Sequence, residues 1–143
     1  MNAQYEKLLD DMYQAWSDQD VEKVAGYYTD DCTYEDMALG VVNRGKDALR
    51  QFIHESYKAL PDFRVVYTQR FASGSRAAGQ WVITGTWNGL FEGVDCTGTQ
   101  IRFTGLSLYE FRDGLIASVK DCWDFTVVMK ALGVLRSDLK SLR

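Results

Sequence analysis

The residue best placed for chemistry is Asp121, a carboxylate on a strand face that is otherwise apolar. The segment 115–123 alternates as a strand, which puts Asp121 on the same face as Val119 and Trp123 and puts Ile116 on the other face. Apolar surroundings disfavour the charged form of a carboxyl group, so we expect the pKa of Asp121 to be raised toward the range useful for proton transfer. Asp121 is therefore the candidate catalytic residue, as a general acid/base.

A structural role for Asp121 is the alternative, as a carboxylate paired with a base such as Arg44. Seven further side chains are candidates for binding a substrate, because they are polar groups near Asp121 in the expected fold or aromatic rings that suit a flat ligand. They are Tyr34, Asp36, His54, Trp81, Trp87, Ser107 and Trp123. Asp36 also suits a turn cap, His54 an exposed helix position, and the tryptophans a core.

The hairpin before Asp121 leaves its cross-strand partner open. A two-residue loop at Asp113-Gly114 puts Leu106 opposite Asp121, whereas a three-residue loop with a glycine bulge puts Ser107 there. A serine in that position could hydrogen-bond the carboxylate.

The elements that position these residues divide the chain into a helical part and a strand part. Apolar residues at helical spacing predict helices over 5–16, 21–28, 46–60 and 125–132, with a short strand and turn over 32–39. The break at Ser17-Asp18-Gln19-Asp20 is expected to supply the N-cap of the second of these helices, and Asp124 that of the last. Alternation predicts strands over 63–72, 77–87, 100–111 and 115–123, with a glycine-rich loop over 89–98. The pattern indicates one α+β domain over residues 1–143, with helices packed on a curved, mostly antiparallel sheet.

Composition narrows the functional classes. The net charge of -4 and the pI of about 4.9 argue against a nucleic-acid partner. No apolar run reaches membrane-spanning length, and the N-terminus does not have the regions of a signal peptide. Three cysteines without a Cys-x-x-Cys spacing fit free thiols in the cytoplasm. A single histidine excludes the usual multi-histidine zinc or iron sites, so we expect no metal, and the sequence contains no glycine-rich phosphate-binding loop.

The strand over 100–111 carries large apolar side chains on both of its faces. Ile101, Phe103 and Tyr109 lie on one face, and Leu106 and Leu108 on the other. The helices can cover only one face, so we expect the other to be covered by a second copy of the chain in a homodimer.

Taken together, these segments resemble the SnoaL-like polyketide cyclases of the NTF2-like superfamily, whose fold is a conical α+β barrel. The resemblance covers nearly the whole chain, and its pieces are Ala15-Trp16 with Asp20, 27–31, Gly45, 60–63, 84–89, Thr97-Gly98, 113–116, Asp121, Asp124 and Leu132-Gly133.

The resemblance implies a cofactor-independent intramolecular aldol condensation, in which an aspartate that matches Asp121 is the general acid/base. A family histidine on the preceding strand is replaced here by Ser107. The chain also resembles limonene-epoxide hydrolases at Tyr34-Glu35-Asp36-Met37 and at Asp121, although the Arg and Asp of that relay are missing from the strand near 80–84.

The sequence therefore favours an enzyme that acts on a hydrophobic, oxygenated small molecule, as a cyclase or a related isomerase. Hydration of a lipophilic epoxide and a non-catalytic small-molecule-binding module are the alternatives.

Overall fold

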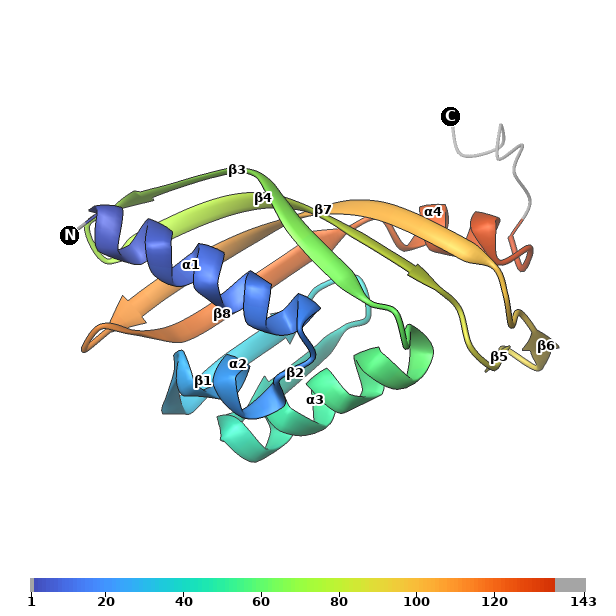
Figure 1. Ribbon diagram of the computed structural model, residues 1–143, viewed down its shortest axis with the longest axis horizontal. Helices are drawn as coiled ribbons and strands as arrows, with labels where there is room; N and C mark the ends of the chain where they lie inside the picture. Colours follow the sequence, from blue (N-terminus) through green and yellow to red (C-terminus); the bar gives the residue numbers. More distant parts are fainter. Residues whose placement is uncertain (1, 136–143) are drawn as a thin grey trace.

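The computed structural model describes residues 2–135, which form helices packed against one curved sheet. The helices are α1 (Asn2–Ser17), α2 (Val21–Gly26), α3 (Gly45–Ala59) and α4 (Phe125–Ala131). Figure 1 shows the long strands curving over α1 and α3, so that the concave side of the sheet faces these helices. The expected α+β fold, with helices packed on a curved, mostly antiparallel sheet, is confirmed.

Six strands make the main sheet, in the order β2-β1-β8-β7-β4-β3. Their bounds are β1 (Tyr28–Asp36), β2 (Val41–Arg44), β3 (Arg64–Ser73), β4 (Arg76–Thr86), β7 (Gln100–Arg112) and β8 (Leu115–Trp123). All neighbours are antiparallel except β1 and β8, which are parallel. A small hairpin of β5 (Leu90–Phe91) and β6 (Val94–Asp95) lies between β4 and β7 in the chain.

The apolar spacing explains which side of a helix is buried, and capping residues explain where two of the helices begin. The apolar stripe of α1 is buried through Leu9, Met12 and Trp16. Asp20 and Asp124 cap α2 and α4 as expected, accepting hydrogen bonds from the backbone N–H groups of Lys23 and Thr126.

Three expected elements differ from the structure. The second helix ends at Gly26, because Tyr27 O accepts the N–H of Ile116 and Tyr28 already pairs with β8. The first strand is therefore longer than expected, and the turn that follows leads into β2, which alternation did not reveal. The glycine-rich loop contains the β5–β6 hairpin.

A bulge in β8 sets the register around Asp121. The hairpin loop is the two-residue Asp113-Gly114, but Ile116 pairs with Phe111 while Ser118 pairs with Glu110, so Ala117 is an extra residue. The bulge places Ser107 opposite Asp121 and turns Ile116 into the core. Ser107 was one of the two cross-strand partners left open from the sequence, but a bulge within β8 places it there and a three-residue loop does not. The expected outward direction of Ile116 is wrong.

None of the helices described within residues 2–135 has the length and hydropathy needed to cross a bilayer. The outer face of the sheet carries exposed apolar residues, among them Val66 at 57%, Leu106 at 56% and Leu108 at 62% exposure.

Gly105 lets the ring of Trp81 lie directly against β7. A Cβ atom on Gly105 would lie 2.2 Å from the Trp81 ring, which is too close for any real contact. The absence of a side chain at Gly105 therefore fixes where Trp81 can lie, and Trp81 in turn contacts the residues around Asp121.

We predict that Gly105→Ala lowers the free energy of unfolding by about 1–3 kcal/mol, because the indole or the strand must move to admit a methyl group. Gly26→Ala is the matched control, since nothing lies within 4 Å of its added Cβ. Urea unfolding of both variants measures the difference. Equal effects of the two substitutions would show that the close approach at Gly105 is unimportant.

Candidate active site

A cavity of about 300 Å³ lies between the concave face of the sheet and the helices. Its walls come from α1, α3, α4, β1, β3, β4, β5, β7 and β8, and most of the lining side chains are aromatic or aliphatic. Asp36, Glu55, Ser56 and Asp121 are the acidic and small polar residues among the lining side chains described within residues 2–135. Such a cavity suits a hydrophobic small molecule with a few polar groups.

A continuous chain of aromatic rings forms one wall of this cavity. Neighbouring rings in the chain have centroids 4.7 to 5.9 Å apart, in the tilted and edge-on arrangements that aromatic pairs favour. In spatial order the rings are Trp81, Phe103, Trp123, Phe125, Phe91 and Trp87. The wall runs from the side chains near Asp121 to the β5–β6 hairpin.

Asp121 is buried with only 6% of its surface exposed, and hydroxyl groups bond both of its oxygens. Ser107 Oγ donates to Oδ1 at 2.5 Å, and the hydroxyl of Tyr34 donates to Oδ2. Trp81 Nε1 donates to Ser107 Oγ at 2.7 Å, which fixes the direction of the serine hydroxyl. The strand register, the close approach at Gly105 and these bonds together orient the carboxyl group.

Burial raises the pKa of Asp121 to about 7, while the hydroxyl donors Ser107 and Tyr34 lower it and the nearby charge of Asp36 raises it. The expected direction of the shift is confirmed. In the described part of the chain, no basic side chain forms an ion pair with Asp121, and Arg44 is not its partner. The geometry thus gives an acid that can exchange a proton near neutral pH.

Asp36 is a second buried carboxylate in the same cavity, with 3% exposure. Trp123 Nε1 lies 3.1 Å from each of its oxygens, and the backbone N–H of Leu39 donates to Oδ1 at 2.9 Å. Burial raises the pKa of Asp36, and these N–H donors lower it. Asp36 therefore caps the turn after β1, as one interpretation of the sequence had it, and also lines the cavity.

Three phenols meet near Asp121 at the end of the cavity formed by α1 and β7. Tyr13 and Tyr67 are hydrogen-bonded to Tyr109 at 2.8 and 2.7 Å. Burial raises the pKa of all three hydroxyls, so they stay neutral and act as hydrogen-bonding groups.

Most of the residues predicted for the site come together. Tyr34, Asp36, Trp81, Trp87, Asp121 and Trp123 line the cavity. Ser107 lies behind Asp121 and contacts its carboxyl group. His54 is exposed on α3, because that helix turns Ile53 into the core and Phe52 and Ser56 toward the cavity.

Several lining residues were missed from sequence. Phe103 shares the inward face of β7 with Ser107, so alternation could have found it. Phe125 and Phe91 could not be assigned in this way, because their positions depend on how α4 and the short hairpin fold back over the sheet. Within residues 2–135, no cluster of three or more His, Cys, Asp or Glu side chains is arranged to share a metal ion.

Comparison with known proteins gives one family and many similar folds. The profile of the SnoaL-like polyketide cyclase family matches residues 6–132. No curated protein sequence matches.

Among solved structures, AclR from Streptomyces galilaeus, described as a candidate hydroxylase, is 21% identical with a TM-score of 0.84, covering 98% of this chain and 91% of its own. IdmH from Streptomyces antibioticus, described as a candidate polyketide cyclase, is 21% identical with a TM-score of 0.80, and the match covers 90% of this chain and 98% of IdmH. A candidate SnoaL-like polyketide cyclase from Jannaschia sp. CCS1 is 19% identical with a TM-score of 0.82, and the match covers 94% of this chain and 95% of the other. At these identities the likeness shows the fold.

The raised pKa of Asp121 predicts a pH dependence of stability. The folded state holds the proton of Asp121 more tightly than the unfolded chain does. The contribution of Asp121 to the free energy of unfolding is therefore fully present below its unfolded pKa and is lost as pH rises through about 7. We predict that Asp121→Asn becomes more stable relative to wild type between about pH 4 and pH 8, by an amount on the order of a few kcal/mol.

Asp62→Asn is the matched control. The backbone N–H and the hydroxyl of Thr86 lower the pKa of Asp62, so its ionised form stabilises the folded state, which is the opposite of the effect at Asp121. Wild type should gain stability over that variant only as pH rises to about 4, the unfolded pKa of an aspartate, and the difference should stay constant between about pH 4 and pH 8. Denaturant unfolding across the pH range measures both, and parallel curves for Asp121→Asn and wild type would contradict the buried-acid assignment.

Proposed function

The chain belongs to the SnoaL-like polyketide cyclase family, and from this premise we propose that it is an enzyme that uses Asp121 as general acid/base on a hydrophobic, oxygenated small molecule. The observation that carries the proposal is the position of Asp121, a buried carboxyl group with a pKa of about 7 at the inner end of an aromatic cavity. The reaction needs no cofactor, because a positioned acid/base group and a carbonyl substrate are sufficient for it.

The proposed chemistry is proton transfer next to a carbonyl group. In an intramolecular aldol condensation, a C–H bond beside one carbonyl is broken, the carbon attacks a second carbonyl carbon, and the second oxygen takes a proton. Asp121 exchanges the protons in these steps, and Tyr34 and Ser107 stabilise its carboxylate form through their hydroxyl donors. Isomerisation uses the same proton transfers without the new C–C bond.

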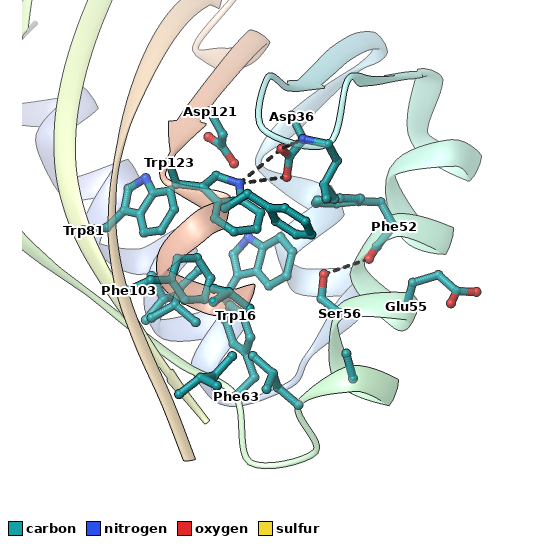
Figure 2. Close-up of a pocket in the computed structure, with 18 of the residues that line it drawn as sticks. Trp16, Asp36, Phe52, Glu55, Ser56, Phe63, Trp81, Phe103, Asp121 and Trp123 are labelled. Carbon is teal, nitrogen blue, oxygen red and sulfur yellow. Dashed lines mark hydrogen bonds between the residues drawn. The ribbon is translucent and has the colours of Figure 1, made fainter. Parts of the chain in front are cut away.

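The cavity supplies binding and orientation. Phe103 and Trp123, which are only partly buried, present ring surfaces on which a flat substrate can stack, close to the carboxyl group (Figure 2). A general acid/base contributes roughly 10²- to 10⁴-fold to a rate, so the rest of the acceleration comes from holding the reacting atoms in place. AclR and IdmH, which share the fold, are described as a candidate hydroxylase and a candidate polyketide cyclase, and the second description fits the reaction proposed here.

Epoxide hydration is a weaker candidate for the same site. Tyr34, Asp36 and Asp121 all line the cavity, which supports a water-holding site of this kind. Trp123 Nε1 contacts both oxygens of Asp36, however, so fewer acceptor positions are left for a water molecule. A binding module without catalysis is the remaining alternative, and Asp121 separates it from the enzyme.

We predict that wild-type protein accelerates the exchange of the methyl protons of 2-acetylnaphthalene for deuterium, because enolisation is the proton-transfer half of the proposed reaction. Asp121→Asn should lower the catalysed rate by roughly 10²-fold or more while ligand binding is kept. Proton NMR in deuterium oxide follows the exchange. Asp124→Asn, which changes a surface cap three residues away, is the control and should exchange like wild type. Equal rates for Asp121→Asn and wild type would favour the binding module.

We also propose that two copies pair through the outer face of the sheet, around Val66, Leu106 and Leu108, and that the protein works in the cytoplasm, where its three free thiols stay reduced. Exposed apolar side chains on β3 and β7 of the same sheet support a buried interface. Light scattering at micromolar concentration should give twice the chain mass of 16.3 kDa, and Leu108→Asp should halve it. A monomeric wild type would contradict the dimer.

A further inference from the structure

Two buried carboxyl groups lie side by side in the cavity. Asp36 and Asp121 are direct partners in the parallel pair β1–β8, and the backbone N–H of Met37 donates to Asp121 O at 2.9 Å. Both side chains point to the cavity side of the sheet, where Figure 2 shows the indole of Trp123 next to them. Two neighbouring acids in a poorly solvated site cannot easily both be charged, so the pair is expected to keep one proton.

The hydrogen-bond partners of Asp36 hold it in the ionised form. Its partners are the indole N–H of Trp123 and the backbone N–H of Leu39, which contact both oxygens between them. An N–H group of either kind can donate a hydrogen bond but cannot accept one. A proton on Asp36 would therefore compete with these donors for the same lone pairs.

The partners of Asp121 differ in kind, because both are hydroxyl groups. A hydroxyl can donate to a carboxylate and can also accept from a carboxylic acid. Trp81 Nε1 already donates to Ser107 Oγ, so the proton of Ser107 points to Oδ1. Only Oδ2, whose partner is the hydroxyl of Tyr34, can gain and lose a proton without breaking a bond.

The surroundings offer no positive charge that would let both acids ionise. The lining side chains described within residues 2–135 include no Lys, Arg or His. Glu55 lies at the α3 side of the cavity and points away from Asp121 (Figure 2). The other titratable groups coupled to Asp121 are phenols from α1, β1 and β7, namely Tyr13, Tyr28, Tyr34 and Tyr109.

We propose that Asp36 is a positioning residue whose fixed negative charge keeps the one proton of the pair on Oδ2 of Asp121, so that Asp121 begins the reaction as a proton donor to a substrate oxygen. The inference rests on the proposed function and names which half of the acid/base cycle comes first. It also names the substrate group, an oxygen acceptor such as a carbonyl that can reach Oδ2 beside Tyr34.

Asp121 gives up one proton and regains one in the proposed cycle. The O–H bond of Asp121 breaks and its proton goes to the carbonyl oxygen of the substrate, which leaves Asp121 as a carboxylate. That carboxylate then removes a proton from the carbon next to the carbonyl, and the C–H electron pair becomes the C=C bond of the enol. Asp121 is protonated again, and Asp36 remains ionised throughout.

Carboxyl-carbon NMR of wild-type protein across the pH range tests the proposal, with Asp36→Asn and Asp121→Asn used to assign the two signals. At about pH 6, Asp121 should show the chemical shift of a protonated carboxyl group and Asp36 that of an ionised one. Asp36→Asn should lower the titration midpoint of Asp121. Asp121→Asn should leave the midpoint of Asp36 nearly unchanged, because Asp36 loses its proton while Asp121 is still protonated and neutral.

This one-sided response separates a charge effect from loosening of the site, because loosening would shift the midpoint of the remaining acid in both variants. Glu110→Gln removes a carboxylate from the exposed face of the same sheet and should leave the midpoint of Asp121 unchanged. A protonated Asp36 beside an ionised Asp121 at pH 6, or an Asp121 midpoint unaffected by Asp36→Asn, would overturn this inference but not the proposed function. A midpoint of Asp121 at or below about 3.9 would overturn both.

Should Asp36→Asn fail to fold, the assigned wild-type spectra still decide the proposal. Trp123→Phe adds a second variant, since it removes the indole donor and keeps the Asp36 carboxylate. It should raise the midpoint of Asp36, and an unchanged midpoint would contradict the role given to the indole.

Discussion

The burial of the Asp121 carboxyl group among aromatic side chains is the constraint on which the site depends. Burial disfavours its charge, and the hydroxyls of Ser107 and Tyr34 offset only part of that effect, so the pKa stays near 7. Loss of either hydroxyl would leave the group less able to ionise, while a basic neighbour would hold it permanently charged. The combination of burial with hydroxyl partners therefore favours an exchangeable proton over a structural ion pair.

Backbone features far from any chemistry make that arrangement possible. The bulge at Ala117 puts Ser107 opposite Asp121, and the bare backbone of Gly105 gives Trp81 room to reach Ser107. The parallel pairing of β1 with β8 then brings Tyr34 and Asp36 alongside. The site is thus built from main-chain geometry first, and its polar contacts follow from it.

The sequence was sufficient for the parts of the fold that have a clear periodicity. The stripe of α1, the long strands and the caps at Asp20 and Asp124 follow local rules, and the inward direction of Asp121 does so too. Features that depend on pairing between distant segments were not accessible. Alternation cannot reveal the bulge that turns Ile116 inward, and β2 and the aromatic wall exist only once the sheet has closed over the helices. His54 was misplaced because one residue on a helix changes its direction by a large angle.

The central claim is that Asp121, at the end of the aromatic cavity, receives a substrate oxygen. A crystal structure of the protein with bound 2-acetylnaphthalene tests it most directly. We predict that the rings lie on Phe103 and Trp123 and that the carbonyl oxygen lies within hydrogen-bond distance of Asp121 Oδ2. A ligand whose oxygen faces the cavity mouth or solvent, with the Tyr34 to Asp121 bond intact and no other group near Oδ2, would contradict the account.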